Sequence, residues 1–220
     1  MPGLGNVDPR YFVSVIITFV IAITVHEFMH AWTAWKLGDD TARLLGRVSL
    51  NPVVHFDPVG AILFVLIALG LPGIAWGRPV PVNDFRLRPV GRLGQHGSMA
   101  LVSFAGPLSN VVLGAIGAGI WRLSTSAGVP LGEAEQFLQI FVFVNFSLAA
   151  FNMVPLPPLD GSRILVALLP AFWRPVLAPL ERYGVPILIL LLIFGRGIGS
   201  EIIRGITDPV LGLLLKIFVS

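Results

Sequence analysis

The sequence predicts an all-α polytopic membrane protein with about five transmembrane helices, a re-entrant segment and a short β-hairpin-like element after the first helix. Hydrophobic residues make up 55% of the 220 residues, and charged residues only 12%, against about 25% in soluble domains. The mean hydropathy is +0.85. Several apolar runs approach or exceed the roughly 20 residues that a helix needs to cross a bilayer. They are 11–35, 97–121, 134–153 and a C-terminal region from 185 onward, either two short spans (185–194 and 202–219) or one span and an interfacial helix.

Charge and cysteine content narrow the class further. The net charge of +3 and the basic pI are explained by arginines that anchor the chain at the cytoplasmic face of a membrane, so the lipid bilayer is the expected partner and nucleic acid is not. The chain has no cysteine, so neither disulfides nor thiolate ligands are available. We expect a single domain over residues 1–220.

The first apolar run ends in the most informative motif of the chain. Residues 11–25 carry no ionisable side chain except the Tyr11 phenol, and His26-Glu27-Phe28-Met29-His30 follows directly. At helical spacing, His26 and His30 lie one turn apart on the same face and can bind one Zn²⁺. Glu27 is placed to take a proton from water at the metal. The alternative is two surface histidines beside an unrelated acid, but unused ionisable groups inside a membrane are costly.

A catalytic zinc site usually has three protein ligands and one open position. Asp160 is the strongest candidate for the third, because it follows an apolar helix that is interrupted by three prolines, and Gly161 permits an unusual turn. The alternative is that Asp160 caps a following helix. His55 and His96 lie in segments rich in Pro, Gly and Arg, and we expect them to be interfacial hydrogen-bonding residues.

The segment after the first helix, 42–56, reads ARLLGRVSLNPVVHF. Its alternation of apolar and polar residues predicts a short extended hairpin. A peptide must be extended to be hydrolysed, and an exposed strand edge could hold it by backbone pairing. The alternative is an interfacial loop that seals the cavity.

The topology follows from where the candidate ligands lie. His26 is about 23 Å from the start of its helix at 1.5 Å per residue, and Asp160 also follows the end of its apolar helix. Both helices must therefore run in the same direction, with one crossing (97–121) between them. Residues 59–76 should then enter the membrane and return, with a break at 70–73.

The distribution of basic residues supports the same topology. With a re-entrant segment, ten basic residues fall on one side and four on the other, whereas a spanning segment would give eight and six. The positive-inside rule favours the first arrangement, which places the N-terminus outside and the site near the cytoplasmic face.

Three motifs together resemble the site-2 proteases, intramembrane zinc metalloproteases. They are HEFMH, the stretch Phe104-Ala105-Gly106-Pro107-Leu108-Ser109-Asn110, and NMVPLPPLDG (152–161), in the family's order and over nearly the whole chain. The segment WGRPVPVN (76–83) resembles the compact prokaryotic branch. The gap of 134 positions from His26 to Asp160 is longer than in a minimal core of the family.

The resemblance implies a multi-pass enzyme of a prokaryotic cell membrane that cleaves transmembrane protein substrates in or near their membrane segment. It implies His26, His30 and Asp160 as zinc ligands and Glu27 as the catalytic acid/base. Asn110 and Asn152 match family asparagines near the active site; they could position the substrate or its oxyanion, or form interhelical hydrogen bonds.

Two alternative functions remain open at this stage. One is a membrane zinc protease for prenylated or secreted peptides, for which a downstream glutamate would be the third ligand. The other is a non-catalytic scaffold or metal transporter that retains the zinc site. The substrate and the oligomeric state do not follow from the sequence.

Overall fold

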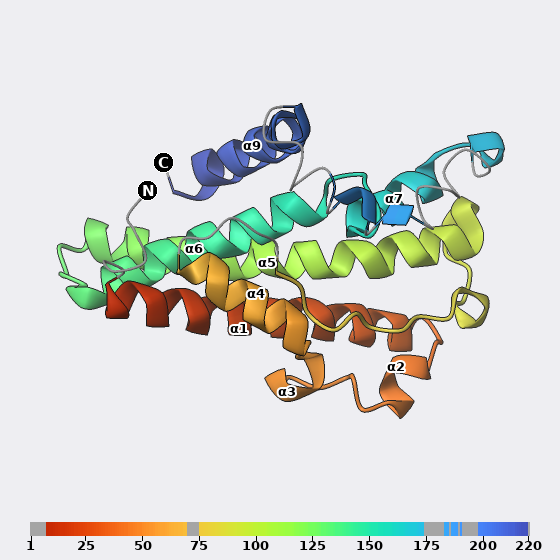
Figure 1. Cartoon of the computed structure of the whole chain (residues 1–220), viewed down its shortest axis with the longest axis horizontal. Coiled ribbons are helices and arrows are strands. Elements are labelled where there is room, and N and C mark those ends of the chain that lie inside the picture. Colours follow the sequence, from red (N-terminus) through yellow and green to blue (C-terminus); the bar gives the residue numbers. More distant parts are fainter. Residues whose placement is uncertain are drawn as a thin grey trace.

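The computed structural model describes residues 8–69, 75–173, 183–184, 186–188, 190 and 198–219, and it is helical (Figure 1). The elements are, in order, α1 (Pro9–Lys36), α2 (Thr41–Leu44), α3 (Pro52–His55), α4 (Pro58–Ala68), η1 (Asp84–Arg86), η2 (Gly91–Leu93), α5 (Gly94–Ser126), α6 (Glu133–Asn152), α7 (Asp160–Leu168), η3 (Ala171–Trp173) and α9 (Ile198–Phe218). The predicted all-α class is thus confirmed for the described residues.

Three long helices form the body of the molecule. They are α1, α6 and the continuous helical stretch 91–126 that contains α5, and each is long and apolar enough to cross a membrane. Helices α1 and α6 run in the same direction and α5 runs against both (Figure 1). Arg10 and Glu133, near the first turns of α1 and α6, form an ion pair, which places these two helix starts side by side. We expected α1, which carries the two histidines, and α6, which precedes Asp160, to run in the same direction, and they do.

The C-terminal part of the chain was predicted with less detail. All but the last residue of the run 202–219 lies within α9, which packs on α5 and α6, whereas most of 185–194 lies outside the described residues. Four apolar residues of α9 cover the buried cluster Ala118, Val142 and Phe146: Leu211, Leu214, Leu215 and Phe218. Because α9 is not among the candidate spans, the count of about five spans stays a prediction.

The predicted hairpin is wrong. Residues 42–56 contain no strand; they form the end of α2, a turn and α3. Gly46 turns the chain at φ +69°, a left-handed conformation that glycine favours. Asn51 then caps α3 by accepting from the amide of Val53, and Pro52 occupies the first helical position. The turn at Gly46 and the helix cap at Asn51 therefore determine the local structure, and the short apolar–polar alternation does not.

The segment from α4 to residue 83 doubles back on itself. Helix α4 has 11 residues, and after it the chain returns to the start of the same helix. Arg78 donates its amide to the carbonyl of His55 at 2.8 Å. A Cβ at Gly60 would fall directly on the carbonyl oxygen of Trp76, so these two backbones are in contact. Residues 75–83 then run as an extended connection beside α1 (Figure 1).

Candidate metal centre

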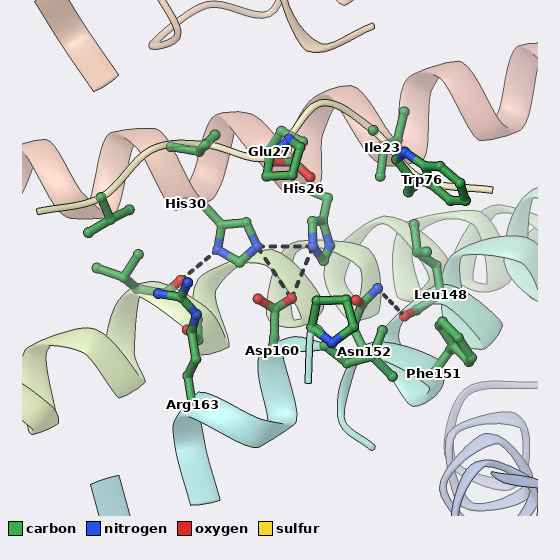
Figure 2. Close-up of a pocket in the computed structure, with 18 of the residues that line it drawn as sticks. Ile23, His26, Glu27, His30, Trp76, Leu148, Phe151, Asn152, Asp160 and Arg163 are labelled. Carbon is green, nitrogen blue, oxygen red and sulfur yellow. Dashed lines mark hydrogen bonds and ion pairs between the residues drawn. The ribbon is translucent and has the colours of Figure 1, made fainter. Parts of the chain in front are cut away.

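The two histidines of α1 and the aspartate that begins α7 meet between the long helices (Figure 2). The Nε2 atoms of His26 and His30 are 3.0 Å apart. The Oδ2 atom of Asp160 lies 3.2 Å from the first and 3.3 Å from the second. Both histidines are buried, and the aspartate is nearly so. The structure therefore brings together all three candidate ligands, although Asp160 follows His26 by 134 positions in the chain.

Hydrogen bonds at the other ring nitrogens fix the tautomer of both histidines. The Nδ1 atom of His30 lies 2.7 Å from the carbonyl oxygen of Val102. A carbonyl only accepts, so Nδ1 carries a proton, and in the neutral ring the lone pair is then on Nε2. The Nδ1 atom of His26 lies 2.7 Å from Asn110 Oδ1, again an acceptor. Both Nε2 lone pairs are thus free for a ligand.

This arrangement fits a bound cation. The Nε2 atoms of two histidines and a carboxylate oxygen converge within 3.3 Å, and in the neutral tautomer described above both Nε2 atoms offer a lone pair. Zinc binds nitrogen and oxygen at about 2.0–2.2 Å in a tetrahedron, whose edges are then about 3.3 Å long. The observed separations of 3.0, 3.2 and 3.3 Å match one triangular face of such a tetrahedron.

Two glycines let the backbone approach closely enough to build this site. A Cβ at Gly106 of α5 would lie 2.5 Å from Cε1 of His30 and 2.7 Å from Cε1 of His26. A Cβ at Gly161 would lie 2.5 Å from the carbonyl carbon of Met153. Gly106 therefore lets α5 pack directly against the rings of the two histidines. Gly161 lets the first turn of α7 pack against the end of α6.

Glu27 lies on the wall of the same cavity (Figure 2). The cavity has a volume of about 380 Å³ and is lined by all three candidate ligands and by residues of the extended connection. Glu27 is 8% exposed, so its carboxylate is largely shielded from solvent. A carboxylate beside an open metal position is the arrangement that proton transfer to and from water requires.

Arg47 connects the surroundings of Glu27 with the extended connection. Its guanidinium donates to the carbonyls of Arg78 and, at 3.3 Å, Pro79, and the residue is 5% exposed. Burial lowers the pKa of Arg47, whereas the negative charge of Glu27 raises it. Arg47 thus holds the extended connection, which forms one wall of the cavity, in place near Glu27.

The remaining residues singled out in the sequence have different positions. Asn110 contacts His26, whereas Asn152 lines the cavity and donates to the carbonyl of Leu148 at 3.0 Å. His55 is buried outside the cavity lining, with Nε2 2.7 Å from the carbonyl of Ser49, and burial lowers its pKa. His96 is half-buried in the first turn of α5 and is not among the residues that line the cavity.

Sequence reasoning missed two buried polar residues near the site. Arg47 was counted only as a basic residue. Its side chain is buried where it donates to the backbone carbonyls of Arg78 and Pro79, which are distant in the sequence. Asn145 of α6 is fully buried and hydrogen-bonded to Asn110 at 3.1 Å. An amide in the middle of an otherwise apolar helix was a signal for the second residue, because such groups need a buried partner.

The fold and the site define a membrane metalloprotein whose centre has two histidines, one aspartate and an adjacent glutamate. The model of peptidase family M50 matches residues 118–195, which include Asp160. YwhC of Bacillus subtilis (strain 168), named as a candidate zinc metalloprotease, is 38% identical over 208 residues, or 92% of this chain and 90% of that protein. The chain belongs to peptidase family M50, the site-2 protease family.

Two further relatives carry similar names. Rip2 of Mycolicibacterium smegmatis is 30% identical over 183 residues, covering 83% of this chain and 67% of that protein. MJ0611 of Methanocaldococcus jannaschii is 32% identical over 180 residues, covering 80% and 82%. Both are named as candidate zinc metalloproteases. No solved structure matches the chain closely enough to add to this comparison.

Proposed function

We propose that this protein is an intramembrane zinc endopeptidase that hydrolyses a peptide bond in or near the transmembrane segment of membrane-protein substrates, as in regulated intramembrane proteolysis. The observation that carries the proposal is the convergence of His26 Nε2, His30 Nε2 and Asp160 Oδ2 within 3.3 Å. This set lies in a cavity between three helices that are apolar enough to cross a membrane, and Glu27 is on its wall. The zinc metalloproteases named among the relatives support the same activity.

The chain supplies each group that peptide hydrolysis needs. When bound by the three ligands, zinc supplies Lewis-acid activation of water and polarises the peptide carbonyl. Glu27 accepts a proton from the attacking water and delivers it to the leaving amine. The buried position of Glu27 keeps this transfer away from bulk solvent. Water provides both the hydroxyl of the new carboxyl group and the proton of the new amine.

The extended connection 75–83 offers a place for an unwound substrate, instead of the hairpin expected earlier. Within the described ranges, the amides of Val80 and Val82 form no hydrogen bond to the protein, and both residues line the cavity. An extended peptide can add to such a backbone edge. Asn152, whose Oδ1 makes no hydrogen bond among the described residues, is placed to hold a substrate amide.

We further propose that α4 and the return after it form a re-entrant segment. An 11-residue helix is about 16 Å long, roughly half the thickness of the hydrocarbon core. The contacts of Trp76 with Gly60 and of Arg78 with His55 support a return to the side of entry. The expected break at 70–73 lies outside the described residues. The ten-to-four charge distribution then supports an outside N-terminus and a site on the cytoplasmic side of the cell membrane.

The test compares the parent chain with Glu27→Gln, His26→Ala and Asp160→Asn in purified, reconstituted form. Zinc is measured by elemental analysis, and proteolysis with a panel of tagged single-span helices that differ in glycine and proline content. We expect about one zinc per chain in the parent and in Glu27→Gln, and a large loss of zinc in the other two variants. Proteolysis should disappear in all three, by a factor of at least roughly 100 for a lost general base.

Each competing function predicts a different result. Continued cleavage by Glu27→Gln would remove that residue from the chemistry. Full zinc content in Asp160→Asn would place the third ligand elsewhere. Zinc binding with no cleavage of any helix, together with metal uptake that survives Glu27→Gln, would favour a transporter over a protease.

A further inference from the structure

A chain of buried hydrogen bonds leads from the metal centre into α6. Asn110 accepts from His26 Nδ1 and donates through Nδ2 to the carbonyl of Ala22 and to Asn145 Oδ1, both at 3.1 Å. Asn145 in turn donates to the carbonyl of Phe141 at 2.9 Å. Both asparagines are 0% exposed. The chain therefore crosses all three long helices out of reach of water.

Two backbone carbonyls fix the orientation of both amides. Ala22 O and Phe141 O can only accept, so each must face an NH₂ group, and the Oδ1 atom of each asparagine must face the other way. Asn145 Oδ1 then faces Asn110, and Asn110 Oδ1 faces His26. Rotating either amide by 180° would bring oxygen against a carbonyl oxygen. The bonds therefore leave one arrangement, in which His26 carries its proton on Nδ1.

We infer that Asn110 and Asn145 are positioning residues that set the tautomer and ring orientation of His26 and thereby the zinc affinity of the site. This inference rests on the zinc site of the proposed function. It assigns Asn110 a different role from oxyanion stabilisation, because both of its N–H groups already have acceptors within the protein. It also adds Asn145, which does not line the cavity and touches no ligand directly.

Groups that orient a metal-binding histidine typically change metal affinity by 10–100-fold when they are removed. We therefore expect Asn110→Leu to weaken zinc binding by roughly 10–100-fold. Asn145→Leu leaves one N–H of Asn110 without its acceptor, but the bond to Ala22 remains. Its effect should be smaller, roughly threefold to tenfold. Because Asn145 acts through Asn110, it should cause no further loss in a chain that already carries Asn110→Leu.

Asn110→Asp separates this role from a contribution to folding. A carboxylate keeps an acceptor for His26 Nδ1–H, but it loses both donors and buries a charge. Zinc affinity should stay within about threefold of the parent, whereas the thermal midpoint should fall below that of Asn110→Leu. If Asn110 were needed only for packing, Asn110→Leu would bind zinc more tightly than Asn110→Asp. Thr18→Val is the matched control, because it removes a buried α1 hydroxyl that has no hydrogen-bond partner among the described residues, and its zinc affinity should equal that of the parent.

The experiment is a competition for zinc between a chromophoric chelator and the purified, metal-free protein in detergent. Circular dichroism melts of each variant are recorded alongside. The expected order of affinities, from tight to weak, is parent, Asn110→Asp, Asn145→Leu and Asn110→Leu. Parent-like affinity in Asn110→Leu, or additive losses in the double variant, would overturn the inference while leaving the zinc site intact. Failure of the parent to bind zinc would overturn the proposed function, and the inference with it.

Discussion

Gly106→Ala tests the closest approach between α5 and the metal centre. The new Cβ would lie 2.5 Å from Cε1 of His30, 2.7 Å from Cε1 of His26, and against His30 Nε2. Ordinary carbon contacts begin at 3.4 Å. The histidine rings or the two helices must therefore separate by about 0.7–0.9 Å. Metal–ligand distances tolerate only about 0.2 Å, so the triangle of donor atoms cannot be preserved.

Two effects of this change can be measured separately. We expect zinc affinity to fall by on the order of 100-fold, the upper end of the range for a disturbed ligand support. Overpacking the interface of α1 and α5 should also lower the free energy of unfolding by about 1–3 kcal/mol. Zinc is followed by chelator competition and stability by thermal unfolding of the metal-free protein.

Gly119→Ala is the control on the same helix. A Cβ there meets no atom of the described residues within 4 Å, and the change should stabilise the helix by about 0.4–1 kcal/mol without affecting zinc. If Gly106→Ala binds zinc as tightly as Gly119→Ala, the two histidines do not pack against α5 as described, and the geometric argument for the site fails.

Three further changes test the surroundings of the site. In Gly114→Ala the Cβ would lie 2.5 Å from an aromatic ring of α6, so thermal unfolding should show a loss of about 1–3 kcal/mol; an unchanged melt would refute that contact. Arg47→Met removes the bonds to the extended connection, so KM for a cleaved helix should rise several-fold at full zinc content, and an unchanged KM would separate this wall from substrate binding. Gly60→Ala forces the carbonyl of Trp76 away, so hydrogen exchange at 75–83 should become faster; exchange at the parent rate would mean that the contact is not maintained.

The parts of the site that follow from local spacing could be predicted from the sequence. His26 and His30 share a face because four residues make about one helical turn, and α1 has no helix breaker between them. Asp160 was marked by the prolines before it and by Gly161 after it. The direction of α6 relative to α1 followed from requiring these residues to meet, and the structure has this direction.

The parts that depend on distant contacts could not be predicted. The alternation at 42–56 predicted a hairpin, but Gly46 and Asn51-Pro52 terminate any strand there. Arg47 and Asn145 are held by carbonyl and amide groups 31 and 35 residues away in the chain. A single sequence carries no record of which polar groups meet across such separations. The extended connection was quoted only as a family-like motif, because its prolines exclude regular structure without indicating which element it lies against.

The separation of His26 from Asp160 along the chain has a consequence for biosynthesis. The two histidines enter the membrane with the first helix, but their third partner follows 134 residues later, behind α5 and α6. At about 5–20 residues per second, a nascent chain needs roughly 7–27 seconds to supply it. Until then the growing chain holds only two of its three candidate zinc ligands. The order of the ligands along the chain thus delays activity until the enzyme has been assembled.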